Sequence, residues 1–271
     1  MVNRYAGKLR GVLNLKAGEK KFQSSLRLPS QDLAFFVEHF WMIKWDLKDQ
    51  ESYLSETLPH PCVHLVFEQD QSRIVGVVKG KFSYLLENKG QVFGIKFKPG
   101  AFYPFIHSPV SQFTDRTISI EEALGIESKP LEDAILLEEN EEAKIEIANN
   151  FLRERLPEQD ENIARISQII DCIITNQEIT RVDDVISRLN LNKRMLQRLF
   201  RLYVGVSPKW VIKRYRLHEA AERLTNGESV DWSQLAQDLG YFDQAHFIKD
   251  FKTIVGKTPA EYAKQNGLDR F

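Results

Sequence analysis

The sequence has 271 residues, of which 42% are hydrophobic and 28% are charged. This length suits about two domains, and the composition excludes a disordered or membrane-embedded chain. No stretch approaches the roughly 20 apolar residues that a helix needs to cross a bilayer. The first ten residues scatter charges where a secretory signal needs an apolar run. Because Cys62 and Cys172 are the only cysteines, a disulfide framework is excluded and a cytoplasmic location is expected.

The net charge of −1 conceals an uneven distribution along the chain. Residues 1–120 carry 16 basic and 11 acidic side chains, whereas residues 121–159 carry 4 and 12. Residues 160–271 carry 17 and 15. The net charge therefore says nothing about binding partners, and the local pattern of charge is the informative quantity.

Short runs rich in Val, Ile, Phe and Tyr recur about every 10 to 20 residues between Phe22 and Phe97. Polar or glycine-containing breaks separate these runs. Many short strands at this spacing predict a β-barrel or a β-sandwich. The predicted strands are Phe40–Trp45, Cys62–Phe67, Ile74–Val78, Phe82–Leu86 and Val92–Phe97.

Aromatic side chains are concentrated on these predicted strands. Inside a small barrel they would line a pocket for an apolar or aromatic effector, but buried strands are rich in aromatic residues in any case. The sequence leaves open whether they form a pocket or fill the core. The candidate effector-binding residues are Trp41, Trp45, Phe67, Phe82, Tyr84, Phe93 and Phe97.

The segment from His60 to His64 has the spacing of a candidate metal site. In a fully extended chain, His60, Cys62 and His64 would point to one face, as zinc or copper ligands do. However, Pro59 and Pro61 favour a turn before the strand, so we predict no metal and no cofactor. The sequence also lacks a phosphate-cradling glycine loop, a nucleophile elbow and a His-Glu-x-x-His helix, and we predict no enzymatic activity.

Residues 129–156 have the pattern of two acidic helices, and the break at Pro157–Glu161 predicts a linker. The second helix carries an apolar stripe. Its residues are Ile145, Ala148, Phe151 and Leu152. A wider set of apolar side chains on the two helices is compatible with a helical dimer seam or with packing inside the monomer. This set is Ile135, Leu136, Leu137, Ile145, Ile147 and Phe151.

The region after the linker contains an internal repeat with an offset of 51 residues, so that Arg198–Arg201 corresponds to Lys249–Lys252. Such a repeat indicates one supersecondary unit that is used twice. In each unit only a few residues separate two helices, and Asn192 or Asp243 is predicted to cap the second helix. Gly240 suits the left-handed conformation of a tight turn. The pattern predicts two helix-turn-helix units.

The second helix of the first unit, predicted from Lys193 to Tyr203, is apolar on one face and basic on the other. From Lys193 to His218 there are eight Lys or Arg residues and no Asp or Glu. A surface of one sign indicates a polyanionic partner, and Arg and Gln side chains suit the base edges in the major groove of DNA. A helix from Pro208 to Thr225 is expected to join the units. The candidate DNA-contacting residues are Lys193, Arg194, Gln197, Arg198, Arg201, Lys209, Gln244, His246, Lys249 and Lys252.

Residues 163–264 resemble the DNA-binding domain of the arabinose-regulator (AraC/XylS) family of bacterial transcription factors. The resemblance implies an all-α domain whose two helix-turn-helix units enter successive major grooves on one side of the DNA. The chain departs from the family pattern at Lys249, where arginine is usual, and lysine offers a point charge in place of a bidentate fork. The matching motifs include Asn192-Lys-Arg-Met-Leu-Gln-Arg-Leu-Phe200, Gly205-Val-Ser-Pro208, Leu239-Gly-Tyr-Phe242 and Phe247-Ile-Lys-Asp-Phe251.

The N-terminal region resembles a cupin-like β domain that occurs in some of these regulators, where it senses a small molecule or mediates dimerisation. The resemblance is carried by Phe36-Val-Glu-His-Phe-Trp41, Leu58-Pro-His-Pro-Cys-Val-His-Leu-Val-Phe67 and Gly94-Ile-Lys-Phe-Lys-Pro-Gly100. We therefore expect an α+β multidomain protein. Its parts are a cupin-like β-barrel or sandwich at residues 1–128, a helical linker region at 129–160, and an AraC-type domain with two helix-turn-helix units at 161–271.

Together these features predict a sequence-specific transcriptional regulator that binds double-stranded DNA and responds to a small-molecule effector through its β domain. A homodimer is expected, RNA polymerase is the expected partner if the protein is an activator, and no membrane is expected. Two alternatives stay open. The β domain is then either a cupin-type metal-binding enzyme or a protein-interaction module, fused in each case to the DNA-binding domain.

Overall fold

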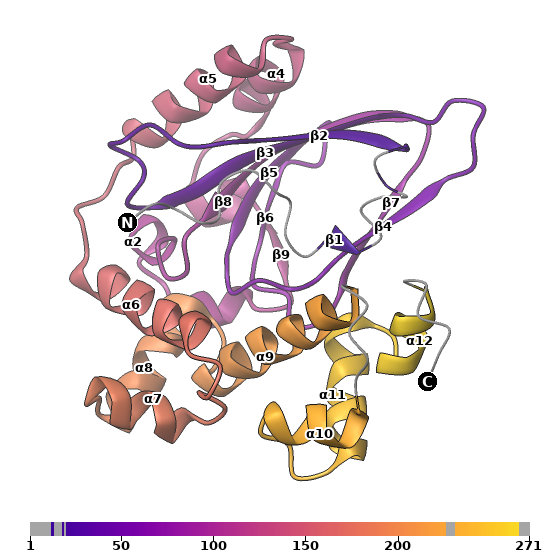
Figure 1. The fold of residues 1–271 in the computed structure, drawn as a ribbon. Helices are drawn as coiled ribbons and strands as arrows, with labels where there is room; N and C mark the ends of the chain where they lie inside the picture. Colours follow the sequence, from indigo (N-terminus) through magenta and orange to yellow (C-terminus); the bar gives the residue numbers. More distant parts are fainter. Residues whose placement is uncertain (1–11, 14–17, 19, 226–230, 266–271) are drawn as a thin grey trace.

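The computed structural model describes residues 12–13, 18, 20–225 and 231–265. Residues 1–11, on which the prediction about a secretory signal rests, lie outside this part of the chain. Strands dominate the first 120 residues, and helices dominate the rest (Figure 1). The strands are β1 (Val12–Leu13), β2 (Phe22–Arg27), β3 (Val37–Asp46), β4 (Tyr53–Thr57), β5 (His64–Glu68), β6 (Arg73–Val75), β7 (Phe82–Leu86), β8 (Lys89–Phe97) and β9 (Thr117–Ser119).

The strands form a six-stranded sheet in the order β2-β3-β8-β5-β6-β9 and a three-stranded sheet in the order β1-β4-β7. All pairs are antiparallel, and Trp45, Val66, Leu86 and Val92 form an apolar cluster between the two sheets. Each of the five predicted strands is present, with ends shifted by at most three residues. The predicted β-rich fold of this region is therefore confirmed.

Side chains alternate between the two faces of the six-stranded sheet, as the pleat of a strand requires. Phe40, Phe93 and Ile95 lie on the face that is covered by helices. Trp41 and Lys96 lie on the opposite face. The covering elements are α2 (Tyr103–Ile106), η1 (Val110–Phe113), α3 (Ile120–Leu124), α4 (Lys129–Leu137) and α5 (Glu141–Arg153).

The helices α4 and α5, which were expected to form a helical linker region, pack against the sheet. Ile135, Ala148, Phe151 and Leu152 are buried in the same core as the sheet residues. The apolar stripe of α5 is thus covered within one chain, because the sheet offers an apolar face at the same place. Packing within the monomer therefore accounts for this stripe, whereas Leu137, another candidate for the dimer seam, is 80% exposed.

The helical half contains both predicted helix-turn-helix units, α7-α8 and α10-α11, and α9 runs between them (Figure 1). Asn192 caps α8 by accepting a bond from the Met195 amide at 3.0 Å, and Asp243 caps α11 by accepting one from the His246 amide at 2.7 Å. Gly240 has φ of +79°, as predicted for the turn. The helices are α6 (Glu161–Thr175), α7 (Val182–Leu189), α8 (Lys193–Leu199), a π-helical continuation η2 (Phe200–Val204), α9 (Pro208–Thr225), α10 (Trp232–Asp238), α11 (Gln244–Val255) and α12 (Pro259–Gln265).

The two halves share apolar cores. Phe36, Val77 and Ala101 of the β region are buried among residues of α6, α8 and α9. Leu58 is buried in the core of the second helix-turn-helix unit. This packing places α9 directly against the segment that connects β4 and β5.

Candidate DNA interface and interdomain cavity

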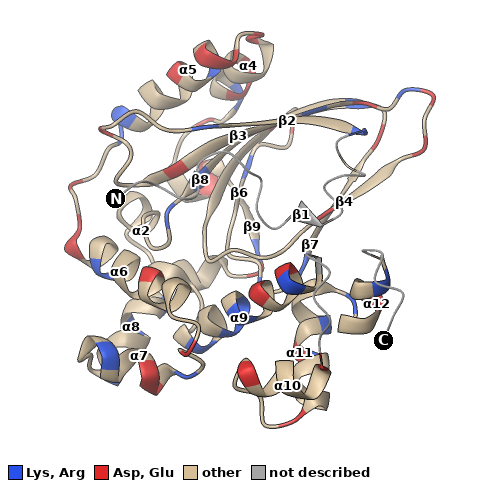
Figure 2. Ribbon diagram, viewed as in Figure 1, with Lys and Arg blue, Asp and Glu red and all other residues tan. Residues whose placement is uncertain are grey.

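The first candidate surface is the outer face of α8. Leu196 and Leu199 are buried, which turns Arg194, Gln197 and Arg198 to the outside, where all three are exposed. Lys193, Arg201 and Lys209 are exposed as well. The residues predicted for the first unit are therefore all exposed on α8, η2 and the start of α9. Figure 2 marks the positions of Lys and Arg along the ribbon in blue.

The guanidinium groups on this surface are not neutralised by the rest of the fold. The guanidinium groups of Arg194, Arg198 and Arg201 form no hydrogen bond or ion pair with any other residue that the structure describes. Lys193 is paired with Asp183 of α7 at 2.9 Å, but both side chains are solvent-exposed, so this pair contributes little and is easily exchanged. Charged groups left without an internal partner are available to a partner molecule.

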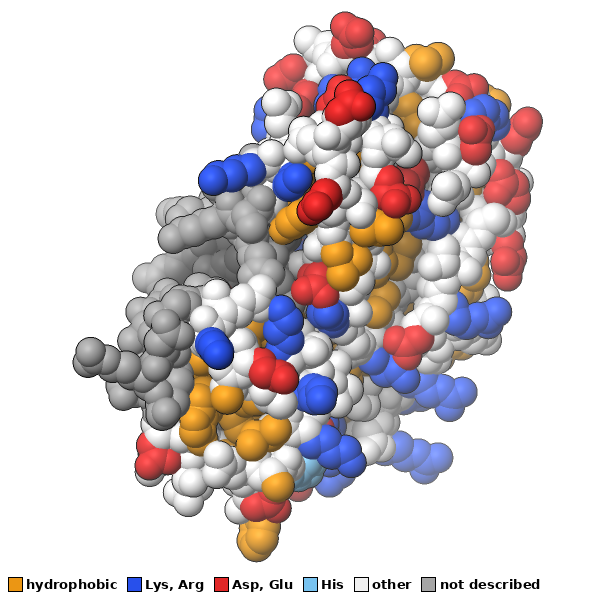
Figure 3. Space-filling view, turned by 90° about the vertical axis from the view of Figure 1, so that its right-hand side faces the viewer, with side chains coloured by type: hydrophobic (Ala, Val, Ile, Leu, Met, Phe, Trp, Pro, Cys, Tyr) orange, Lys and Arg blue, Asp and Glu red, His pale blue; other side chains and the backbone are white. Residues whose placement is uncertain are grey.

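The second unit presents a different surface. Lys249 and Lys252 are exposed on α11, whereas Gln244 is half-buried and lies 3.5 Å from the Ser233 hydroxyl. His246 is exposed and lies 3.5 Å from Asp250, which also pairs with Lys213 of α9 at 2.8 Å. Basic side chains gather along the right-hand edge of the helical half in Figure 3. The second unit thus offers lysines and an acidic neighbour where the first offers arginines.

Sequence reasoning missed one exposed residue in the second unit. Phe242 lies in the turn immediately before the Asp243 cap and is 97% exposed. Its neighbour Tyr241 is half-buried and packs against Phe247 with ring centroids 5.6 Å apart. Two adjacent aromatic residues in a turn carry no pattern that indicates which one faces inward.

A cavity of about 1480 Å³ lies between the open face of the six-stranded sheet, the three-stranded sheet and the helices α6 and α9. Trp41, Trp45, Phe82 and Tyr84 line it, as predicted for a pocket. Trp41 and Trp45 lie flat against β8 because their cross-strand partners are Gly94 and Gly90, where a Cβ atom would lie within 2.3 Å of the indole rings.

The other three residues predicted for this pocket do not line it. Phe67, Phe93 and Phe97 are at most 1% exposed and belong to the core beneath the helices. Successive side chains of a strand point to opposite faces of the sheet. The residues of β5 and β8 that line the cavity are His64, Val66, Val92 and Lys96. Phe67, Phe93 and Phe97 lie at the alternate positions of these strands and therefore point away from the cavity.

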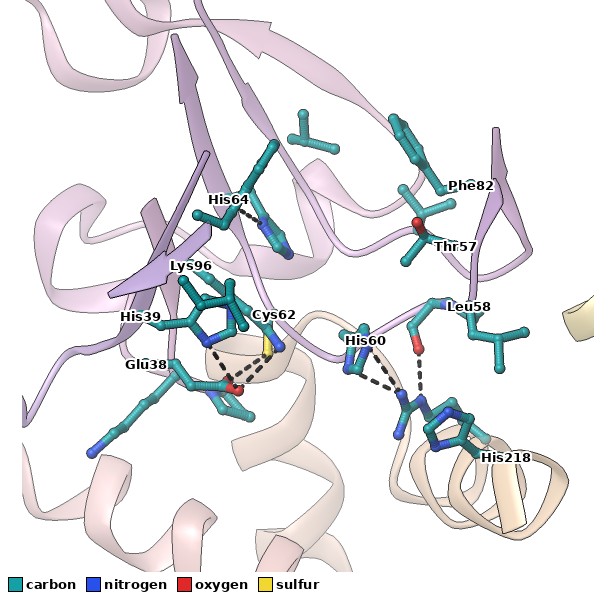
Figure 4. Close-up of a pocket in the computed structure, with 18 of the residues that line it drawn as sticks. Glu38, His39, Thr57, Leu58, His60, Cys62, His64, Phe82, Lys96 and His218 are labelled. Atoms are coloured by element: carbon teal, nitrogen blue, oxygen red, sulfur yellow. Dashed lines mark hydrogen bonds and ion pairs between the residues drawn. The ribbon is translucent and has the colours of Figure 1, made fainter. Parts of the chain in front are cut away.

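One wall of the cavity carries polar groups that bind one another (Figure 4). Glu38 accepts a bond from Lys96 at 3.1 Å and lies 3.7 Å from the Cys62 sulfur. Burial favours the neutral carboxyl, but the charge of Lys96 keeps the pKa of Glu38 below its usual value. Burial raises the pKa of the Cys62 thiol to about 12, which excludes a reactive thiolate at neutral pH.

Histidines gather at the same cavity, and burial lowers the pKa of three of them, His39, His60 and His64. Burial and the nearby Lys96 lower the pKa of His39 to about 4 and that of His64 to about 3. His64 Nδ1 accepts a bond from the Trp41 indole at 3.2 Å. His60, Cys62 and His64 all line the cavity. Nevertheless, the described part of the chain contains no group of three His, Cys, Asp or Glu side chains arranged to hold a metal ion.

Three of the eight basic residues counted between Lys193 and His218 are not part of the exposed surface, and one of them, Lys213, is half-buried and paired with Asp250. Arg214 and Arg216 are buried where α9 meets the β region. Arg214 Nε donates to the Pro59 carbonyl at 2.6 Å, and Arg214 Nη2 lies 3.0 Å from His60 Nδ1. The basic run in the sequence is therefore divided among the exposed surface of α8 and the start of α9, the ion pair with α11 and the interdomain cavity.

Two family models match the chain. Residues 185–265 match a helix-turn-helix domain, and residues 26–119 match a domain of unknown function (DUF6597). No helix among the described residues is long and apolar enough to span a membrane.

Several curated relatives are transcriptional regulators. The transcriptional activator AarP of Providencia stuartii is 31% identical over 115 residues, which cover 42% of this chain and 82% of AarP. The raffinose operon regulatory protein RafR of Pediococcus pentosaceus is 35% identical over 86 residues, or 31% of this chain. The regulator YtdP of Bacillus subtilis is 29% identical over 170 residues, or 58% of this chain. The matches span only 30% of RafR and 22% of YtdP.

A solved AraC-type DNA-binding domain from Chromobacterium violaceum superposes with a TM-score of 0.34 at 24% identity. The superposition covers 38% of this chain and 93% of that structure.

Proposed function

The chain belongs to the AraC family of helix-turn-helix transcriptional regulators, and on this premise we propose that it binds specific sites in double-stranded DNA under the control of a small molecule. In this proposal α8 and α11 enter successive major grooves about one helical turn apart. The cavity between the β region and α9 holds the effector.

The observation that carries the DNA-binding proposal is the set of unpaired guanidinium groups on α8. Arg194 and Arg198 flank Gln197 on the exposed face, and the described residues offer the two arginines no acidic partner. In the major groove, arginine can form two hydrogen bonds with the edge of guanine, and glutamine can form two with the edge of adenine. Lys209 and Lys252 suit phosphate contacts, which position the protein without reading sequence.

The observation that supports sensing is the composition of the cavity wall. Arg214 and His218 of α9 line the same space as Trp41 and Tyr84 of the β region. Since α9 runs between the two helix-turn-helix units, a molecule in this cavity touches the element that joins them. We propose residues 1–128 as the sensing part and residues 161–271 as the DNA-binding part.

The test is genome-wide mapping of the DNA bound by the full chain, followed by affinity measurements on the recovered site. The expected result is a shared motif with two elements about one helical turn apart. Arg194→Ala should reduce enrichment of that motif, whereas Lys89→Ala, an exposed lysine at the start of β8, should leave it unchanged. Recovery of fragments without a shared motif, or equal behaviour of the two variants, would refute the proposal.

A further inference from the structure

The turn of the second helix-turn-helix unit is one residue longer than the turn of the first. In the first unit, one residue separates Asn190, which has φ of +49°, from the Asn192 cap of α8. In the second unit, two residues separate Gly240, which has φ of +79°, from the Asp243 cap of α11. The two left-handed residues are 50 positions apart in sequence, whereas the two caps are 51 apart. One residue has therefore been added between them.

The backbone hydrogen bonds of the two turns identify the added residue. The Leu191 amide donates to the Ile186 carbonyl at 3.0 Å, and the Tyr241 amide donates to the Ala236 carbonyl at 2.9 Å. Such a bond closes many helices that end in a left-handed residue. Leu191 packs against the core of the first unit, and Tyr241 packs against the core of the second. These two residues are thus equivalent, and Phe242 has no counterpart in the first unit.

The fold holds the backbone on both sides of Phe242 but leaves its ring uncovered. On one side, Tyr241 packs against Phe247 with ring centroids 5.6 Å apart. On the other side, the Asp243 carboxylate accepts a bond of 2.7 Å from an amide in the first turn of α11. Phe242 is nevertheless 97% exposed, and no other large hydrophobic side chain described between residues 161 and 265 is exposed. The added residue is therefore an isolated aromatic ring at a fixed place in the turn.

This place favours contact with DNA. In helix-turn-helix proteins, residues at the N-terminus of the second helix reach the base edges in the major groove. Phe242 directly precedes the cap of α11, and the exposed Lys249 and Lys252 follow on the same helix. An apolar protein interface needs a contiguous patch of roughly a few hundred Å² or more, which one ring does not supply. A single ring does match the methyl group of thymine, the apolar feature that the major groove presents.

We propose that Phe242 contacts the C5 methyl group of one thymine in the DNA site of the second helix-turn-helix unit. This inference rests on the proposed DNA binding and adds a specificity-determining residue to it. The contact is favourable because the ring and the methyl group both leave water. The exposed lysines of α11 offer point charges, which do not form a bidentate pair with a base. Phe242 would therefore give the second unit a base preference that its lysines do not provide.

The test removes the methyl group from the DNA and the ring from the protein, separately and together. Replacing thymine by deoxyuridine deletes the C5 methyl group and keeps the base pair. Each thymine of the site recovered by genome-wide mapping is replaced in turn, and dissociation constants are measured with the full chain. One replacement should weaken binding by the parent about fourfold, which is the effect of exposing one methyl group. Phe242→Ala should bind the thymine site about fourfold more weakly and should respond to the same replacement by less than about 1.5-fold.

Leu137→Ala is the matched control, since it also removes an exposed apolar side chain. Leu137 is 80% exposed on α4, which lies at the opposite end of the molecule from α10 and α11 (Figure 1). This variant should keep the affinity of the parent and its response to deoxyuridine. Because neither side chain is buried, the melting temperatures of both variants should equal that of the parent.

Three results would overturn the inference. In the first, no deoxyuridine replacement weakens binding by the parent. In the second, a replacement weakens the parent and Phe242→Ala equally. In the third, Phe242→Ala binds DNA as the parent does but changes transcription, which would assign the ring to a protein partner. Binding to a specific site that depends on Arg194 but not on Phe242 would refute this inference alone, whereas the absence of any specific site would refute the DNA-binding proposal as well.

Discussion

The two helix-turn-helix units share a framework and differ in their exposed chemistry. In both, an Asn or Asp caps the second helix, and Gly205 or Gly256 ends it in the left-handed conformation with φ of +90° or +84°. The outward residues have diverged, because folding constrains the caps and the buried face but not the exposed face. A repeated fold therefore does not imply a repeated function.

The first unit carries arginines without internal partners, whereas the second carries lysines and Asp250. That aspartate holds Lys213 at 2.8 Å, which ties α11 to α9. We therefore expect the first unit to supply most of the base readout and the second to contribute mainly backbone contacts. Substitutions at equivalent positions of the repeat test this division.

The largest difference is expected between Arg198→Ala and Lys249→Ala, which occupy equivalent positions of the 51-residue repeat. Arg198→Ala should weaken binding to the selected site by about 1–3 kcal/mol and relax preference at one base pair. Lys249→Ala should cost less than about 1 kcal/mol with no change in preference, because a point charge does not form a fork. Dissociation constants on the site and its single-base variants, at one salt concentration, measure both. Equal losses would contradict the division.

A smaller effect is expected when the second unit is given an arginine that can form two hydrogen bonds with one base. Lys249→Arg should create a preference for guanine at one position, with a gain of about 1 kcal/mol over the other bases. Lys252→Arg, on the same helix, serves as the control and should leave the preference unchanged. Selection of bound sequences from a random pool measures both variants. An unchanged motif in Lys249→Arg would show that this position does not face a base.

The smallest effect is expected from a residue that lies outside α8 and α11, the second helices of the two helix-turn-helix units. Lys209→Ala, at the start of α9, should reduce the slope of log K against log salt by about 0.9, which corresponds to one phosphate contact. The order of preference among sites should stay the same, since phosphate contacts carry no sequence information. Binding measured across a salt series checks the slope. A change in preference would assign Lys209 to base readout instead.

Much of the framework was predictable because it depends on short segments. The caps at Asn192 and Asp243, the turn at Gly240 and the approximate strand positions all follow from residues close in sequence. The aromatic residues of the β region were predictable only as a set. The alternation of side chains along a strand places Trp41 and Phe93 on opposite faces of the sheet. However, no residue close to them in sequence indicates that α4 and α5 cover the face that holds Phe93.

The sequence alone was sufficient for the duplicated units and the basic face of α8, because caps, periodicity and charge act within one or two helical turns. The cavity, and the burial of Arg214 and Arg216, required the folded chain. Arg214 donates to the Pro59 carbonyl across 155 positions of sequence. In the sequence both arginines belong to one basic run with Arg194 and Arg198, and only long-range packing shows which members of that run are buried and which are exposed.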